Sequence, residues 1–155
     1  MEFNLSPSFS ASEQTLFRGV NVEGGLPESR FSDDQRAKYN PGFVLNDVEA
    51  PVWLIYDADV FAGFDYELTV EAQAGTPGLE RVVEQFNYTT SSYDVVGAEP
   101  ESFNIDSIST NALLPNNFGP NQEVRARVGW YQTGFTLNFP WEIRVDQVAW
   151  NQLQP

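Results

Sequence analysis

Acidic side chains in the predicted loops are the first groups in this sequence that could do chemistry. Asp33 and Asp34 lie in the polar stretch 27–39, and Asp146 lies near the end of the chain. Calcium takes about six to eight oxygen ligands from carboxylates and backbone carbonyls. We therefore take these three residues as candidate ligands of a Ca²⁺ ion. The alternative is that they are simply solvated, since the sequence has no calcium loop of the D-x-D-x-D-G kind.

Aromatic side chains beside the loops are the second candidate group. Tyr88 and Tyr93 flank a polar four-residue stretch, and Tyr131 and Phe135 lie in the stretch "WYQTGF". A sugar ring has an apolar face that stacks on an aromatic ring and a polar rim that takes hydrogen bonds. These four residues are therefore candidate carbohydrate-binding residues; the alternative is that each is core or incidental surface. Three tryptophans share the apolar parity of their runs and are predicted to be core: Trp130, Trp141 and Trp150.

Catalysis has few options in this chain, because it contains no cysteine and no histidine. Thiolate nucleophiles, disulfides, zinc sites built from Cys and His, and His-dependent triads are all excluded. A glycosidase-like pair of carboxylates remains. Glu67 and Glu71 share one strand face, but the rise along a strand puts them about 13 Å apart, which is too far for either glycosidase geometry. We predict that the protein is not an enzyme.

The charge balance makes two classes of partner unfavourable. The 155 residues include 22 Asp and Glu but only 8 Lys and Arg, which gives a net charge of −14. Nucleic-acid binding draws its affinity from basic residues that displace counterions, and anionic membranes attract basic segments. No apolar run approaches the roughly 20 residues of a membrane-spanning helix. We expect neither a nucleic-acid partner nor insertion into a membrane.

Alternation of apolar and polar residues runs through most of the chain and predicts β-strands. Residues 64–74 alternate strictly, which indicates a strand with one buried face. Residues 51–60 are apolar on both parities, which predicts a central strand covered on both faces. Residues 79–88 and 93–99 are separated by a short polar loop and predict a hairpin. Further strands are predicted at 15–25 and 103–114.

Glycine and proline punctuate these runs at the spacing expected of a sandwich or barrel. The stretch 27–39 has the best chance of forming a helical turn. The predicted fold is all-β, an antiparallel, jelly-roll-like β-sandwich of about eight or nine strands. We expect it to form one domain over residues 1–155, with its core between Thr15 and Trp150.

Near the C-terminus, arginines alternate with apolar residues. Arg125 and Arg127 lie on one parity, and Val124 and Val128 lie on the other. In the last run the apolar parity changes, which predicts a β-bulge around Asp146 and Gln147. The arginines are predicted to pair with glutamates of neighbouring strands, and the alternative is an arginine ladder that faces a ligand. The candidate partners are Glu67, Glu71 and Glu84.

Four stretches of the sequence resemble a known group of β-sandwich domains. They are "GGLPESRFSDD", "NPGFVLNDVEAPVWLIYDADV", "LERVVEQFNYTTSSYDVVGAE" and "EVRARVGWYQTGF…FPWEIRVDQVAW". The group consists of secreted or surface proteins of planctomycetes and related environmental bacteria, and it is mostly uncharacterised. The resemblance implies a jelly-roll fold similar to carbohydrate-binding and galactose-binding-like modules, and it implies export. It supplies no catalytic motif, so no site residue is carried over from it.

Three functions are open from the sequence. The leading hypothesis is a non-catalytic extracellular or cell-surface module that binds a polysaccharide. The second is a structural subunit that packs with other surface proteins in a layer, filament or particle, because the apolar, aromatic chain ends could add a strand to a neighbour's sheet. The third is a carboxylate-dependent enzyme that acts on glycans.

Overall fold

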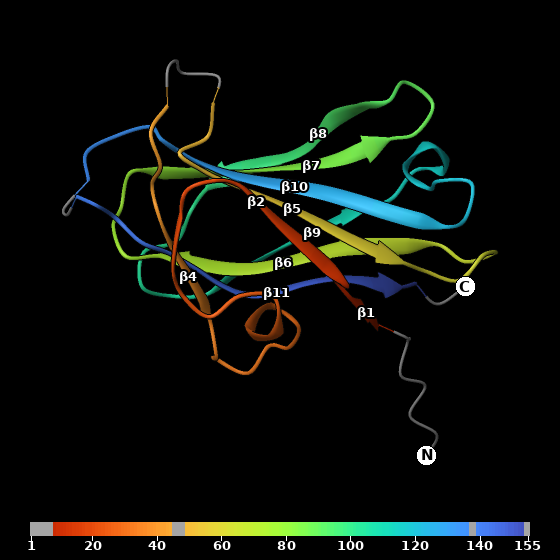
Figure 1. The fold of residues 1–155 in the computed structure, drawn as a ribbon, viewed down its shortest axis with the longest axis horizontal. Coiled ribbons are helices and arrows are strands. Elements are labelled where there is room, and N and C mark those ends of the chain that lie inside the picture. Colours follow the sequence, from red (N-terminus) through yellow and green to blue (C-terminus); the bar gives the residue numbers. More distant parts are fainter. Residues whose placement is uncertain (1–7, 45–48, 137–138, 154–155) are drawn as a thin grey trace.

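Two antiparallel β-sheets stacked face to face form the fold (Figure 1). The computed structural model describes residues 8–44, 49–136 and 139–153. The six-stranded sheet has the order β3 (Val20–Glu23), β4 (Ala37–Asn40), β11 (Ile143–Gln152), β6 (Tyr66–Ala74) and β9 (Ser107–Ala112), with β1 (Ser8–Ser10) also paired to β11. The five-stranded sheet has the order β2 (Glu13–Arg18), β5 (Val52–Asp59), β10 (Glu123–Gln132), β7 (Leu79–Asn87) and β8 (Ser92–Pro100). The described residues also form two short 3₁₀ turns, η1 (Pro27–Ser29) and η2 (Pro115–Asn117), and none of their helices is long and apolar enough to cross a membrane.

The predicted fold class is confirmed, although the described residues form eleven strands rather than about eight or nine. One reason is that the stretch 15–25, predicted as one strand, contributes to two. Gly19 lies between β2 of one sheet and β3 of the other, and its φ is 121°. A Cβ at this position would lie 3.2 Å from the carbonyl oxygen of Asn40. Glycine therefore lets the chain cross from one sheet to the other.

The core lies between the two sheets and follows the predicted alternation. Strand β5 buries Val52, Leu54, Tyr56 and Ala58, whereas Trp53 and its neighbours of the same parity are half-buried or exposed. The prediction that this strand is covered on both faces is therefore wrong, because only its inner face packs against another sheet. The three tryptophans predicted to be core are at most 2% exposed, and burial of a large apolar side chain contributes about 1.5–3 kcal/mol.

The hairpin and the C-terminal bulge both form as predicted. Strands β7 and β8 pair antiparallel on either side of a short loop. The register between β11 and β6 shifts between Val145 and Gln147, so that Val145 and Val148 are both buried in the core. Asp146 is the extra residue of the bulge, and it is also fully buried. The helical turn predicted within 27–39 is the single turn η1.

A buried ion pair joins β7 to the residue after β8, and its arginine also bonds to the opposite sheet. The guanidinium of Arg81 donates to both carboxylate oxygens of Glu101, at 2.7 and 2.8 Å, and both side chains are fully buried. The indole N–H of Trp130 also donates to Glu101, at 2.7 Å. Arg81 in addition donates to the backbone carbonyls of Val70 and Ala72 in β6. Removing one partner from such a pair costs about 3–5 kcal/mol, because the other charge is left buried alone.

Candidate functional site

The outer face of the five-stranded sheet carries a cluster of aromatic and arginine side chains, which we call the aromatic face: Trp53, Phe86, Tyr93, Arg125 and Arg127. At its centre, the guanidinium of Arg127 lies 4.1 Å from the ring centres of both Trp53 and Tyr93. Each such cation–π contact contributes about 0.5–2 kcal/mol, depending on its exposure to water. Glu84 of β7 fixes the guanidinium by accepting hydrogen bonds from Nε and, at 3.0 Å, from Nη2. Two rings therefore flank a cation whose position is fixed.

Trp53 has room on this face because residue 129 in β10 is glycine. Trp53 and Gly129 are partners in the β5–β10 register. A Cβ on Gly129 would lie 3.2 Å from Cδ1 of Trp53 and 2.9 Å from Cβ of Ala50. Phe17 of β2 packs edge-on against the indole, with ring centres 5.2 Å apart. The indole is therefore positioned by the two strands that adjoin β5.

A second group of rings extends the aromatic face to the end of β7. Phe86 packs edge-on against Tyr88 and Tyr93, with ring centres 4.9 and 5.2 Å apart. The guanidinium of Arg125 lies 5.9 Å from the ring centre of Phe86 and forms an ion pair with Asp57. Both arginines of β10 are thus held between an acidic and an aromatic side chain.

Two hollows lie at opposite ends of this face. The Tyr131 hollow has a volume of about 620 Å³ and lies against β7, β8 and the end of β10; its polar and aromatic lining includes Glu49, Glu80, Glu84 and Tyr131. The Tyr88 hollow has a volume of about 350 Å³ and lies against β2, β5 and the start of β10; its lining includes Glu13, Asp57, Asp59, Tyr88, Glu123 and Arg125. Ligand pockets commonly measure about 300–1,000 Å³. Both hollows have the size of a site for one or more sugar units.

The tyrosines of the two hollows are strong candidates for hydrogen-bond donors. Burial, reinforced by the negative charge of Glu123, raises the pKa of Tyr88 to about 12. The pKa of Tyr131 is also raised, first by burial and then by Glu84. Both phenols therefore keep their protons at neutral pH.

Three of the four predicted carbohydrate-binding residues lie together here. Tyr93 belongs to the central cluster, and Tyr88 and Tyr131 each line a hollow. Phe135 instead lies in the segment after β10, where it is 79% exposed and lines neither hollow. Sequence reasoning missed Trp53, because its run is apolar on both parities. A signal was present, since Asp57 and Asp59 share the parity of Trp53 and mark that face as the outer one.

The predicted cross-strand partners of the arginines are correct in one case. Glu84 pairs with Arg127 as predicted. Glu67 and Glu71 are wrong as partners, because β6 belongs to the opposite sheet. Arg125 pairs with Asp57 of β5 instead.

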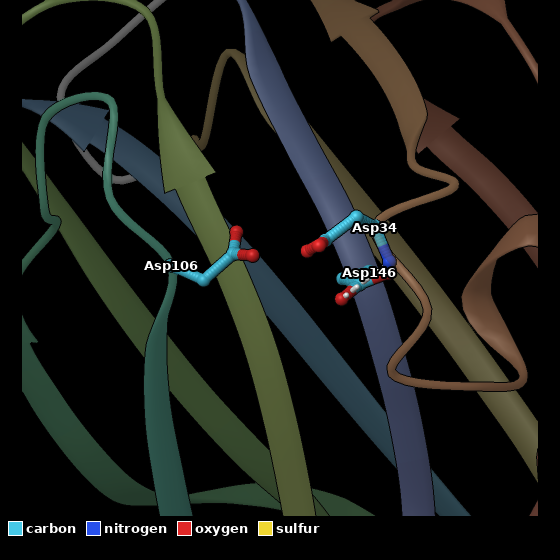
Figure 2. A group of neighbouring side chains, drawn as sticks. All are labelled: Asp34, Asp106 and Asp146. Carbon is cyan, nitrogen blue, oxygen red and sulfur yellow. Dashed lines mark hydrogen bonds between the residues drawn. The ribbon is translucent and has the colours of Figure 1, made fainter.

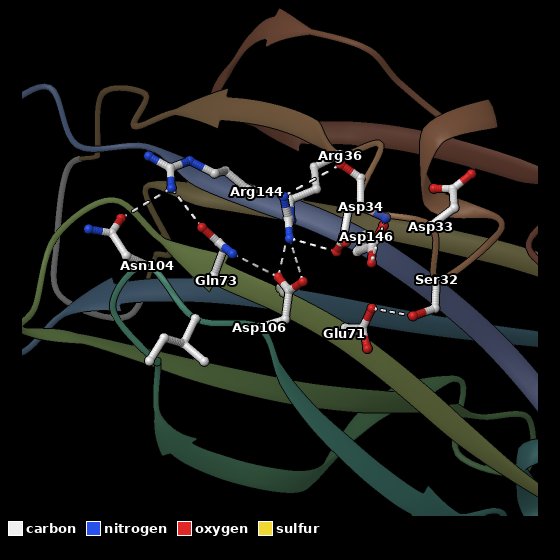
Figure 3. Close-up of polar contacts among 12 residues, drawn as sticks. Ser32, Asp33, Asp34, Arg36, Glu71, Gln73, Asn104, Asp106, Arg144 and Asp146 are labelled. Carbon is white, nitrogen blue, oxygen red and sulfur yellow. Dashed lines mark hydrogen bonds and ion pairs between the residues drawn. The ribbon is translucent and has the colours of Figure 1, made fainter.

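A second candidate site is the acidic cluster formed by Asp34, Asp106 and Asp146 (Figure 2). Asp34 lies in the loop before β4, Asp106 directly precedes β9, and Asp146 is the bulge residue of β11. One carboxylate oxygen from each residue lies within 4.8 Å of the others. Two of the three predicted ligands, Asp34 and Asp146, are therefore brought together. Asp33 is turned away from them (Figure 3). Its Oδ1 accepts a hydrogen bond from the backbone N–H of Gln35.

Arg36 already links two members of the acidic cluster. Its Nη2 donates to Asp34 Oδ1 at 2.9 Å and to Asp106 Oδ2 at 2.6 Å, and its Nε donates to Asp106 Oδ1 at 3.1 Å. The pKa of Asp106 is lowered, chiefly by these hydrogen bonds from Arg36. Gln73 donates a further bond to Asp106 at 2.9 Å (Figure 3). Arg36 therefore lies between Asp34 and Asp106 and favours the charged form of Asp106.

Asp146 differs from the other two acids because it is fully buried and incompletely bonded. Its Oδ2 accepts the backbone N–H of Asp34 at 3.4 Å, while Oδ1 has no hydrogen-bond partner among the described residues. Burial, followed by the neighbouring carboxyl group of Glu71, raises the pKa of Asp146 to about 7. A buried carboxylate oxygen without a partner is costly. A hard cation bound by oxygen ligands would satisfy it, and Arg36 would have to move aside to give up Asp34 and Asp106.

The fold is similar to that of solved β-sandwich carbohydrate-binding modules. No protein-family model and no curated protein matches the sequence, so the likeness is one of structure. The chain is similar to the CBM22-1 xylan-binding domain of Paenibacillus barcinonensis Xyn10C, with 11% identity, a TM-score of 0.54, and coverage of 98% of this chain and 96% of that chain. It is similar to a carbohydrate-binding module of family 29, with 6% identity, a TM-score of 0.54, and coverage of 94% and 88%.

A third similar structure contains further modules. It comprises the CBM22-1 and GH10 modules of Clostridium thermocellum endo-1,4-β-D-xylanase 10B complexed with xylohexaose. The identity is 9% and the TM-score is 0.56; the match covers 98% of this chain but only 29% of that one. This chain therefore corresponds in fold to one module of that larger protein.

Proposed function

We propose that this protein is a non-catalytic carbohydrate-binding module and that the aromatic face is its binding site. The observation that carries the proposal is the cluster in which Arg127 is fixed between Trp53 and Tyr93, with a hollow at each end. The likeness in fold to a xylan-binding domain and to a module solved with xylohexaose supports it. The absence of histidine and cysteine from the sequence supports a non-catalytic role.

The glycan chain lies along β10, from one hollow to the other. Arg125 and Tyr131 are six residues apart in this strand, which corresponds to about 20 Å at about 3.3 Å per residue. Apolar sugar faces pack on the exposed parts of Trp53 and Tyr93. Arg127 uses Nε and Nη2 to bind Glu84, and its Nη1 remains to donate to a sugar hydroxyl. The phenols of Tyr88 and Tyr131 donate at the two ends.

A glycan array followed by affinity electrophoresis tests this proposal. We expect binding to at least one polysaccharide, and we expect Trp53→Ala to weaken it by about tenfold or more, as for a central aromatic anchor. Phe31→Ala is the matched control, because Phe31 is 63% exposed and lies in the loop before β4, which packs on the other sheet. Absence of binding across a broad panel, with and without Ca²⁺, contradicts the proposal. Equal loss in both variants contradicts the assignment of the site.

We propose in addition that the acidic cluster binds Ca²⁺ and that the ion stabilises the fold. The unpartnered, fully buried Oδ1 of Asp146 supports this, since a cation would supply its missing partner. The ion would join the loop before β4 to β9 and β11, far from the aromatic face. Calorimetric titration with CaCl₂, with MgCl₂ as the comparison, should give a Ca²⁺-specific binding signal that Asp146→Asn abolishes. An identical heat signal in the two proteins contradicts a site at Asp146.

We propose that the module acts outside the cell or at its surface. Its fold resembles a module of a xylan-degrading enzyme, whose substrate is a polymer. The acidic surface, with a net charge of −14, also suits a medium that contains screening cations. Fractionation of the source cells with an antibody against this chain tests the location, and recovery in the cytosolic fraction alone contradicts it.

A second candidate function, self-assembly, has one observation in its favour. Phe17, Val20 and Val22 are 50–55% exposed on the edge strands β2 and β3, where the sequence pattern predicted ordinary strand packing. An edge strand with exposed apolar residues can pair with a second copy of the chain. Sedimentation velocity across a wide concentration range tests this, and a strict monomer at high concentration contradicts it.

A further inference from the structure

We infer that the aromatic face selects glycans by charge: it accepts neutral chains and rejects chains that carry carboxylate or sulfate groups. The inference rests on the proposed function, because it names the substrate class of the same site. The inference is based on the positions of the charged side chains in and beside the two hollows. These positions are separate from those of the aromatic rings.

Every arginine on the face is already neutralised by an acid. Arg127 pairs with Glu84, and Arg125 pairs with Asp57. Arg18 lies outside the aromatic face but beside the Tyr131 hollow, and it pairs with Glu49: its Nη1 lies 3.0 Å from Oε2 of that residue. The positive charge of each of these arginines is therefore already balanced by a carboxylate before an anionic sugar approaches. Arg125, the most exposed of the three with 44% of its side chain accessible, is held by an acid like the others.

Four further carboxylates line the hollows without a basic partner within the described part of the chain. Glu80 lies in the Tyr131 hollow. The other three lie in the Tyr88 hollow: Glu13, Asp59 and Glu123. All eight lysines and arginines of the sequence lie in the described ranges, and none forms an ion pair with these four acids. Both ends of the proposed glycan path therefore carry excess negative charge.

The negative charge of the hollows raises the pKa values of the two tyrosines that line them. After burial, the largest contribution that raises the pKa of Tyr88 comes from Glu123. Glu84 and Glu80 both raise the pKa of Tyr131, also after burial. A uronate or sulfate group placed beside either phenol would meet the same repulsion. A neutral sugar would not, and a protonated amino sugar would be attracted.

The expected size of the selection follows from Coulomb's law. Two like charges about 8 Å apart in water repel enough to change a binding constant about twofold, and more where water is partly excluded. Removing one unpaired acid from each hollow should therefore improve binding of an anionic chain about fivefold at low salt. At about 0.5 M NaCl the gain should largely vanish, because the Debye length becomes shorter than these separations.

The experiment compares polymers that share a backbone and differ in charge: hydroxyethyl cellulose with carboxymethyl cellulose, and highly methyl-esterified pectin with polygalacturonate. Affinity electrophoresis measures each pair for the wild type, for Glu80→Gln with Glu123→Gln, and for a matched control. The control is Asp65→Asn with Glu67→Gln, which removes the same charge beside and within β6 of the other sheet. Specific ¹³C labels on tyrosine measure the pKa values of Tyr88 and Tyr131 in the same proteins without any ligand.

We expect the wild type to bind a neutral polymer more tightly than its anionic counterpart. The variant with Glu80→Gln and Glu123→Gln should reduce the ratio of neutral to anionic affinity about fivefold, and it should lower the pKa values of both tyrosines. The control variant should change neither the ratio nor the pKa values. Equal wild-type binding of both members of a pair overturns the inference but leaves the proposed function intact. Unchanged ratios and unchanged tyrosine pKa values in the first double variant also overturn it. Binding of no polymer in either pair or in the wider glycan panel overturns the proposed function, and the inference with it.

Discussion

Replacing Asp146 by asparagine should make the calcium-free protein more stable at alkaline pH. In the calcium-free protein the pKa of Asp146 is raised from 3.8 to about 7, by burial and then by the neighbouring carboxyl group of Glu71. One pKa unit corresponds to about 1.4 kcal/mol, so the full shift sets a ceiling of about 4 kcal/mol on the cost of the charged form. An asparagine amide can accept the N–H of Asp34 and donate to Glu71, and it never becomes charged.

The sign of the pH dependence follows from the direction of the shift. A carboxyl whose pKa is raised on folding keeps its proton in the folded state between about pH 4 and pH 7, where the unfolded chain has lost it. The free energy of unfolding of the wild type should therefore fall as the pH rises through this window and stay low above it. Asp146→Asn lacks this loss. At about pH 8 in EDTA we expect the variant to be more stable by about 1–4 kcal/mol, and the gap should close near pH 4.

Urea denaturation followed by tryptophan fluorescence, in EDTA at several pH values, measures the effect. Ca²⁺ at about 100 times its dissociation constant should raise the stability of the wild type by about 2.7 kcal/mol and so narrow the difference, or reverse it where the difference is smaller than this. The variant should gain none of this. A variant that is less stable than the wild type at pH 8 in EDTA refutes the reasoning, as does a wild-type stability that does not change between pH 4 and pH 8.

Three further substitutions test separate parts of the account. Arg81→Met should lower the free energy of unfolding by about 3–5 kcal/mol in urea denaturation, and adding Glu101→Leu should recover most of that loss. A loss below about 1 kcal/mol in the Arg81→Met variant contradicts the role of the buried pair. Arg36→Gln should tighten Ca²⁺ binding several-fold in calorimetry, because it removes a competing cation from Asp34, and weaker binding would show that Arg36 supports the ion. Arg127→Met should weaken glycan binding about tenfold in affinity electrophoresis while thermal unfolding shifts by only a few degrees, and unaltered binding would exclude the guanidinium as a ligand contact.

The layers of the fold could be predicted because a strand has a period of two and only one face of each sheet is buried. The strand within 64–74 and the bulge at Asp146 are read from apolar parity. The prediction that this strand has one buried face is wrong, because Thr69, Glu71 and Gln73 on its polar parity are buried as well. The division of 15–25 could not be predicted in this way, because a chain that crosses between sheets at Gly19 keeps no single buried face. The interior ion pair between Arg81 and Glu101 was also missed, although Glu101 directly follows β8 and β8 pairs with β7, because alternation alone does not show that a charged residue takes a buried position.

Sequence reasoning placed a candidate site residue correctly where the position of that residue depends only on its own loop or strand. Tyr88 and Tyr93 flank one hairpin, so their position on one face follows from local register. Asp106 was missed because it joins Arg36 from 70 residues away, through the pairing of sheets that the sequence does not specify. The choice between Asp33 and Asp34 depends on a single backbone angle. Asp34 has φ of 62°, a conformation that aspartate adopts more readily than most residues, and alternation does not apply in such a turn.

The most direct test of the central claim is an NMR titration of the isotope-labelled protein with an oligosaccharide from a polysaccharide that it binds. We predict that the largest shift changes fall on the indole N–H of Trp53, the guanidinium of Arg127 and the backbone of β5, β7 and β10. Resonances of β6, β9 and β11, in the opposite sheet, should change little. Shift changes confined to that opposite sheet, or to the segment around Phe135, would contradict the assignment of glycan binding to the aromatic face.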